Sequence, residues 1–122
     1  PQENANRTGV RWAAWTDDAG NGLLVAGEPT LSVSAWPYSL QDLEQATHTD
    51  DLPQEPNITV NLNDKQQGVG GIDSWSRHAR PLPQYRLKTS HPYQYQFYLM
   101  PYHKTSTPIS RIARKVLPDN DQ

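Results

Sequence analysis

The chain has 122 residues, which is enough for one domain with a modest core and no more. Apolar residues make up 34% and 11 prolines interrupt the chain, so short strands with proline-rich connections fit better than dominant helix. A net charge of −2 gives no electrostatic reason to bind nucleic acid or an anionic membrane. The absence of cysteine excludes disulfides and thiolate metal sites, and no apolar run approaches the roughly 20 residues of a membrane helix.

Alternation of apolar and polar residues predicts strands over residues 9–16, 23–26, 31–36, 58–63 and 93–100. Turn-forming residues at 17–22 predict a hairpin between the first two, and Glu28-Pro29 is expected to end the second. In the first strand we expect Trp12 to share a face with Val10 and Ala14. In the last strand the aromatic residues at every second position predict an ordinary core face rather than a stacking surface for nucleic acid. A brief strand is expected at 85–87.

Two short helices are predicted. Ser39 and Asp42 have the spacing of a capping box, which predicts a helix over 40–46. Apolar residues at helical spacing predict an amphipathic helix over 108–117, closed by Pro118; they are Ile109, Ile112, Ala113 and Val116. The expected fold class is therefore all-β, an antiparallel β-sandwich with one or two short helices.

The candidate site is a glycine-rich loop that follows the strand at 58–63. Gly68, Gly70 and Gly71 allow close approach of a ligand or of another backbone segment, and the loop ends at Trp75. A large aromatic side chain on a polar loop can form a platform for a sugar, with one apolar face and a hydroxyl edge. The same residue can instead fold back and anchor the loop on the sheet. The residues alone leave both interpretations open.

Catalytic and metal sites are not expected in this chain. A retaining glycosidase needs two carboxyl groups about 5–5.5 Å apart. Most of the 13 acidic residues fall in turns, in the capping box or in the tail, where carboxylates have structural roles. His48, Asp50 and Asp51 match no strong metal-binding spacing, and the glycine cluster lacks the frame of a phosphate loop.

The run from Asp64 to Trp75 resembles a signature of the large bacterial β-galactosidases of glycoside hydrolase family 2. Further stretches agree in the right order over residues 1 to 102, including Pro1-Gln2-Glu3-Asn4 and Gly9-Val10-Arg11-Trp12. The resemblance implies the C-terminal domain of such an enzyme, the small-chain region or domain 5. It also implies a galactose-mutarotase-like supersandwich. On this basis residues 1–103 are expected to be an N-terminally truncated β-sandwich domain, and 104–122 a C-terminal extension.

The resemblance also implies roles for particular residues. In the family, the tryptophan of this motif reaches the active-site mouth and stacks on sugar. This role falls on Trp75, with Asp73 and Ser74 as supports of the loop. Both catalytic glutamates of the family lie in a TIM barrel outside this chain, so the chain alone is expected to be inactive. Ile72 stands where the family often has an aspartate, and the tail beyond His103 is longer than usual.

The expected partners are a β-galactoside substrate, held through the barrel of the full-length chain, and further copies in a homo-oligomer. No cofactor is expected here, because the Mg²⁺ and Na⁺ that family members commonly use are bound mostly elsewhere. Two alternatives stay open. One is a free-standing carbohydrate-binding module that grips glycans through Trp75, and the other is an assembly domain in which Trp75 touches no ligand. The sequence leaves the cellular compartment open.

Overall fold

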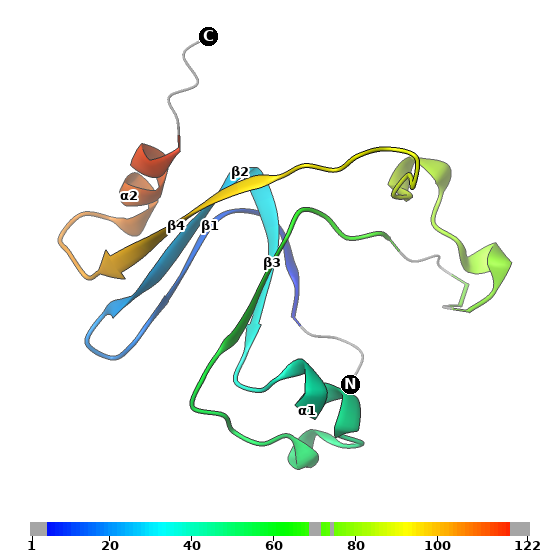
Figure 1. The fold of residues 1–122 in the computed structure, drawn as a ribbon, viewed down its shortest axis with the longest axis horizontal. Coiled ribbons are helices and arrows are strands. Elements are labelled where there is room, and N and C mark those ends of the chain that lie inside the picture. Colours follow the sequence, from blue (N-terminus) through cyan, green and yellow to red (C-terminus); the bar gives the residue numbers. More distant parts are fainter. Residues whose placement is uncertain (1–4, 69–71, 74, 118–122) are drawn as a thin grey trace, which may run out of the picture.

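A computed structural model describes residues 5–68, 72–73 and 75–117. The regular elements are β1 (Arg7–Thr16), β2 (Asn21–Trp36), α1 (Leu40–Gln45), β3 (Thr59–Asn63), β4 (Gln96–His103) and α2 (Ile109–Val116). Short 3₁₀ turns lie in the connections at Thr49–Asp51, Arg77–Ala79 and Pro83–Tyr85. Figure 1 shows a largely antiparallel β structure with one helix near each end of the sheet. The predicted all-β, sandwich-like class with short helices is confirmed. The division of the chain at residue 103 stays a prediction.

β2 is the central strand, and the other strands all pair with it in antiparallel fashion. β1 lies along one edge of β2. On the other edge, β4 pairs with Asn21–Glu28 and β3 pairs with Ser32–Trp36 (Figure 1). The described strands therefore form one four-stranded sheet.

Pro29 does not end β2, so the prediction of two strands separated at Glu28-Pro29 is wrong. The pairing with β1 moves from Leu31, opposite Val10, to Ala26, opposite Trp12. Residues 27–30 thus bulge out of the ladder with β1. A bulge is one of the few places where a strand tolerates proline, because a ladder N–H is not required there.

The same register shift changes the faces of β1. Val10 packs against the core together with Ala13 and Trp15, whereas Trp12 follows the shift and lies on the opposite face from Ala13. The predicted grouping of Trp12 with Val10 is therefore wrong. Side chains alternate strictly between the two faces only within an uninterrupted ladder. The bulge inserts an extra residue, so the side chains that follow it change face.

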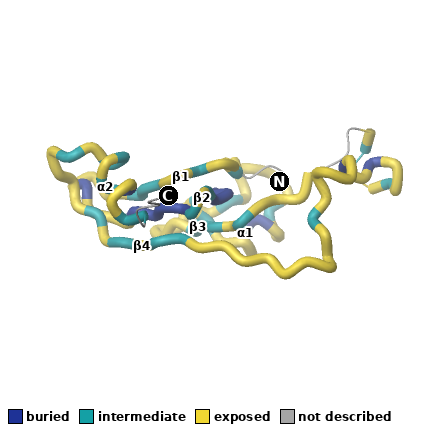
Figure 2. Tube along the Cα trace, turned by 90° about the horizontal axis from the view of Figure 1, so that it is seen from above, coloured by how far each residue is buried: buried dark blue, intermediate teal, exposed yellow. Residues whose placement is uncertain are grey.

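The main core cluster lies on the face of the sheet that carries Val25, Leu31 and Val33 of β2, and Leu24 and Ala26 are fully buried on the opposite face. Five partly buried residues surround it: Val10, Ala13, Trp15, Leu62 and Phe97. Figure 2 shows that burial is concentrated along β2, whereas the long connection between β3 and β4 is almost entirely exposed.

The two helices follow from local sequence signals. At α1 the predicted capping box is present: the Asp42 amide donates to Ser39 Oγ at 3.1 Å, and the Ser39 amide donates to Asp42 Oδ2 at 2.7 Å. α1 buries Leu43. α2 begins after Pro108, packs against β2 and buries Ala113, as its helical spacing predicts. None of the helices in the described part of the chain is long and apolar enough to cross a membrane.

β4 begins at Gln96 rather than at Tyr93, and it continues to His103. Tyr93 and Tyr95 precede the strand, and their hydroxyls bond to the backbone of Lys88 and to the carbonyl of Leu62. The expected strand at 85–87 is also wrong, because residues 83–85 form a 3₁₀ turn. We call the exposed segment from residue 64 to residue 95 the connecting arm. In Figure 1 it extends from the sheet on the side away from α2.

Candidate functional site

The candidate site lies on the connecting arm, where Asp73 and Trp75 are described and Ser74, Gly70 and Gly71 lie outside the described residues. Asp73 Oδ1 accepts hydrogen bonds from the backbone N–H groups of Trp75 (2.9 Å) and Ser76 (2.6 Å). This is an Asx turn, a local alternative to regular backbone pairing. The turn leads directly into the 3₁₀ turn Arg77–Ala79, in which Ala79 is buried.

The N–H groups of Ser76 and Trp75 lower the pKa of the Asp73 carboxyl, because they donate to its charged form. Asp73 is therefore a carboxylate at neutral pH and is occupied by the turn. Asp73 thus holds its own turn, and its role as a support of a substrate-binding loop stays a prediction. Nothing in the described residues assigns a role to Ser74.

Trp75 is 85% exposed, which makes it the most exposed of the large hydrophobic side chains in the described residues. By contrast, Trp15 packs against the core and Trp36 stacks on Tyr38 at a centroid distance of 6.2 Å. The indole of Trp75 thus contributes almost nothing to the packing of this chain. Such a side chain is available to a ligand or to another protein surface.

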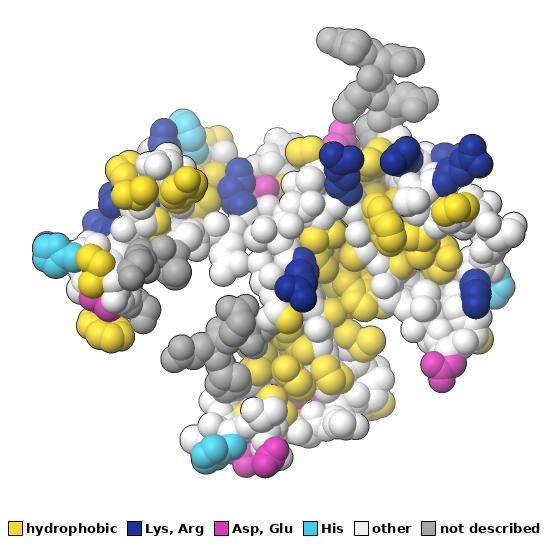
Figure 3. Space-filling model, turned by 180° about the vertical axis from the view of Figure 1, so that it is seen from behind, with side chains coloured by type: hydrophobic (Ala, Val, Ile, Leu, Met, Phe, Trp, Pro, Cys, Tyr) yellow, Lys and Arg dark blue, Asp and Glu magenta, His cyan; other side chains and the backbone are white. Residues whose placement is uncertain are grey.

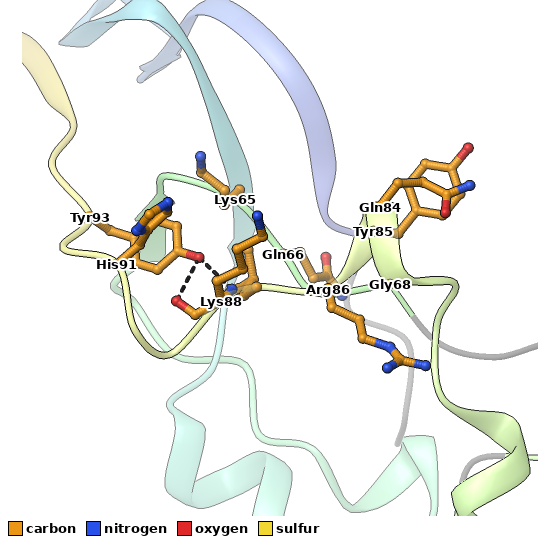
Figure 4. Close-up of a pocket in the computed structure, with 10 residues that line it drawn as sticks. Lys65, Gln66, Gly68, Gln84, Tyr85, Arg86, Lys88, His91 and Tyr93 are labelled. Atoms are coloured by element: carbon orange, nitrogen blue, oxygen red, sulfur yellow. Dashed lines mark hydrogen bonds between the residues drawn. The ribbon is translucent and has the colours of Figure 1, made fainter.

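A separate cleft of about 490 Å³ lies along the inner part of the arm (Figure 4). Its basic residues are Lys65, Arg86, Lys88 and His91, and aromatic rings come from Tyr85 and Tyr93. The Tyr93 hydroxyl closes the loop from Lys88 to Tyr93, since it accepts from the Lys88 amide at 2.6 Å and donates to the Lys88 carbonyl at 3.0 Å. Lys65 Nζ lies 5.3 Å from the centroid of the Tyr93 ring, within cation–π distance.

The cations of this cleft do not all converge. In Figure 4 the Lys65 and Lys88 side chains extend to the same side, whereas Arg86 extends away from them. Arg86 Nε donates to the Pro81 carbonyl at 2.6 Å, which fixes the guanidinium to the arm. Trp75 is not among the residues lining the cleft. The cleft was not predicted, although Arg86, Lys88 and His91 are close in the sequence and could have indicated it.

The other acids with shifted pKa values hold turns or caps. The pKa of Asp17 is lowered by the Asn21 amide, that of Asp42 by the Ser39 hydroxyl, and that of Asp51 by the His48 amide. His48 Nδ1 lies 3.6 Å from Asp51 Oδ2, so this pair belongs to the 3₁₀ turn Thr49–Asp51. Over the described residues, no cluster of three or more His, Asp or Glu side chains could hold a metal ion.

Comparison with known proteins identifies the class. Residues 1–99 match the family model described as the β-galactosidase small chain. The chain is 46% identical over 101 residues to a β-galactosidase of Priestia megaterium, which covers 83% of this chain and 10% of that protein. It is 42% identical over 95 residues to a β-galactosidase of Bifidobacterium adolescentis, covering 75% of this chain and 9% of that one.

The chain therefore belongs to the β-galactosidase small-chain family. It is also 48% identical over 45 residues to a protein of Latilactobacillus sakei named β-galactosidase small subunit, covering 37% of this chain and 14% of the relative. The chain spans about a tenth of the length of the first two relatives. α2, at Ile109–Val116, lies beyond the residues that the family model matches.

Proposed function

We propose that this chain acts as the C-terminal domain, domain 5, of a β-galactosidase of glycoside hydrolase family 2. The enzyme would hydrolyse terminal, non-reducing β-D-galactose residues. The observation that supports this most strongly is the 46% identity over 101 residues with a β-galactosidase of which the chain spans 10%. A match to so small a part of the relative fits a chain that acts as one domain of a larger enzyme.

Within this enzyme we assign no catalytic residue to the chain. The carboxylates whose pKa is lowered are each bonded to backbone or hydroxyl groups of their own turns. A general acid needs a raised pKa, and these shifts have the opposite direction. The catalytic carboxylates, and the Mg²⁺ and Na⁺ ions common in this enzyme class, would come from the rest of the protein.

The contribution of the chain to the active site is Trp75. Its indole is 85% exposed on a turn held by two hydrogen bonds to Asp73. An exposed indole on a backbone turn held in this way can stack on the apolar face of a galactoside at the mouth of a neighbouring barrel. The turn reduces the conformational entropy that ordering the backbone of this loop would cost on binding.

A second contribution is assembly into a homo-oligomer. Leu23 on β2 and Leu99 on β4 are 39% and 53% exposed, and these two strands pair with each other in the sheet. Figure 3 shows hydrophobic side chains forming a band over the central part of the molecule on the face viewed from behind. Exposed apolar surface of this kind favours contact with another domain or subunit.

A domain exchange tests the proposal. In the P. megaterium enzyme, the 101 matched residues would be replaced by this chain, and turnover of a chromogenic β-galactoside would be measured. We expect the exchanged enzyme to be active, the enzyme with the segment deleted to be inactive, and the chain alone to show no turnover. Full activity of the deleted enzyme would contradict the proposed role. Turnover by the chain alone, lost on substitution of one of its acids, would contradict the absence of catalytic residues.

A further inference from the structure

A hollow of about 370 Å³ lies at the end of the sheet far from Trp75, between the β1–β2 turn and the start of α2. Trp12 and Ala14 of β1, Tyr102 of β4 and Ile109 of α2 line it. Thr16 and Tyr102 both pair with Gly22, so their side chains share one face of the sheet. In Figures 1 and 2 this end and the connecting arm lie on opposite sides of the molecule.

The rim of the hollow is fixed by hydrogen bonds. Asp17 Oδ1 accepts from the Asn21 amide at 2.8 Å, and the Lys104 amide donates to the Gly20 carbonyl at 2.9 Å. Gly20 has a φ of +84°, and a Cβ built there would lie 2.5 Å from Lys104 Cβ. Only glycine fits this turn without strain. Because Gly20 has no Cβ, the Lys104 side chain can lie directly against the hairpin.

The aromatic residues give the hollow an apolar wall. Trp12 is 38% exposed although it lies on a central part of β1, and the bulge in the ladder is what turns it to this face. Ala14 lies beside it and leaves room above the sheet. An indole next to such a space can take a flat, partly apolar ligand.

Two charged side chains of the rim are available to a ligand. Asp17 is occupied by Asn21, but Asp18 and Lys104 form no ion pair within the part of the chain that the structure describes. Around the indole, the Asp18 carboxylate can accept hydrogen bonds, the Lys104 ammonium can donate them, and the Thr16 hydroxyl can do both. The rim carries two carboxylates against one ammonium group, which disfavours an anion, and each of these groups can hydrogen-bond a hydroxyl group. A neutral ligand with hydroxyl groups and one apolar face fits this set best.

We propose that this hollow is a second carbohydrate-binding site, which takes one neutral hexose residue with its apolar face on the indole of Trp12. Asp18 accepts from hydroxyl groups of the sugar and Lys104 donates to them. Lys104 and Ile109 lie beyond residues 1–99, so this site uses a part of the chain outside the family match. The site is independent of the proposed role of Trp75 in the galactosidase.

The test uses the full 122-residue chain, labelled with ¹⁵N, and methyl β-D-galactopyranoside as the probe. We expect saturable shifts of the Trp12 indole N–H signal and of the amides of Gly20 and Lys104. Trp12→Ala should weaken binding about tenfold or more, which is the scale of one lost stacking contact. Trp75→Ala is the matched control, since it removes an exposed indole elsewhere, and it should leave these shifts and their affinity unchanged.

Asp18→Asn and Lys104→Met provide variants that leave the indole in place. Asp18 is an exposed turn residue, so its substitution should preserve the fold, which the unperturbed spectrum of the free chain would verify. We expect each variant to weaken binding severalfold. Absence of saturable shifts up to the solubility of the probe would overturn the proposal, as would shifts confined to Asp73–Arg77. Unchanged binding in folded Trp12→Ala would overturn it as well. None of these outcomes depends on galactosidase activity, so the proposed function is tested separately.

Discussion

Asp73 holds the backbone of Trp75 directly: the Oδ1 atom of Asp73 lies 2.9 Å from the amide nitrogen of Trp75, two residues along the chain. The same oxygen accepts from the Ser76 amide at 2.6 Å. A carboxylate that accepts two backbone hydrogen bonds fixes the direction in which the chain leaves the turn. The most exposed indole of the described residues thus stands on a turn held by two hydrogen bonds to one carboxylate oxygen.

This contact predicts a pH dependence. The pKa of Asp73 is lowered, chiefly by the Ser76 amide, so its stabilising contribution is complete above the unfolded value of about 3.9. It is lost as the pH falls through the lower folded value. The amide shifts of Trp75 and Ser76 should therefore titrate together, with a midpoint below about 3.9. Asp73→Asn should abolish this titration. A midpoint at or above the ordinary value would show that the two hydrogen bonds do not form in solution.

Trp75→Ala should separate binding from packing. Because the side chain is 85% exposed, the melting temperature of the chain should hardly change. In the exchanged P. megaterium enzyme, KM should rise roughly five- to hundredfold, which corresponds to about 1–3 kcal/mol for one stacking contact. A core tryptophan would instead cost about 3–5 kcal/mol of stability.

Tyr85→Ala is the control for this experiment, because Tyr85 is another exposed aromatic residue of the connecting arm. Its loss should leave KM unchanged. A large drop in melting temperature for Trp75→Ala, with KM unchanged, would make Trp75 a packing residue and remove it from the proposed site.

The elements best predicted from the sequence are those set by local signals. The capping box of Ser39 and Asp42 places α1 within one residue, and the apolar spacing of Ile109 to Val116 places α2. The capping box records contacts within a few residues, and the apolar spacing records one buried face of a helix, so both can be recognised without knowing the segment that packs on them.

The errors concern features that depend on distant partners. Pro29 stays inside β2 because β1 leaves the ladder there, and Trp12 changes face for the same reason. The basic cleft and the hollow beside Trp12 each join segments far apart in the sequence, such as Lys65 with Lys88 and Trp12 with Lys104. Residue types alone do not show which segments meet, so a pattern could indicate the basic residues from Arg86 to His91 but not their meeting with Lys65, and it could not indicate the hollow.

Substitution of Ala113 should show that the packing of α2 on β2 contributes to the stability of the chain. It is buried where α2 packs against β2, so Ala113→Asp places a charge in an apolar contact. We expect a loss of about 1–3 kcal/mol in the free energy of unfolding, measured by urea denaturation. Arg114→Asp changes the neighbouring exposed position and should stay within about 0.5 kcal/mol. Equal stability of the two variants would show that α2 does not pack on β2.

Leu23 and Leu99 should cause the chain to associate with itself. Leu99 pairs with Val25 and Leu23 pairs with Pro101, so both leucines lie on the same face of the β2–β4 pair. Both are exposed, whereas Val25, the partner of Leu99 on β2, is fully buried. Exposed leucines beside a core residue extend the apolar surface to the edge of the sheet, and a second copy can cover it.

Light scattering and sedimentation velocity over a range of concentrations measure this association. The unaltered chain should form dimers or larger species as concentration rises, and Leu99→Lys should shift the equilibrium toward monomer. Leu40→Lys is the matched control, because Leu40 is another exposed leucine, at the start of α1, and it should leave the association unchanged. The unaltered chain remaining monomeric at high concentration would contradict the role of this face. Equal weakening by both substitutions would instead indicate association through general hydrophobicity, because a specific contact distinguishes the two leucines.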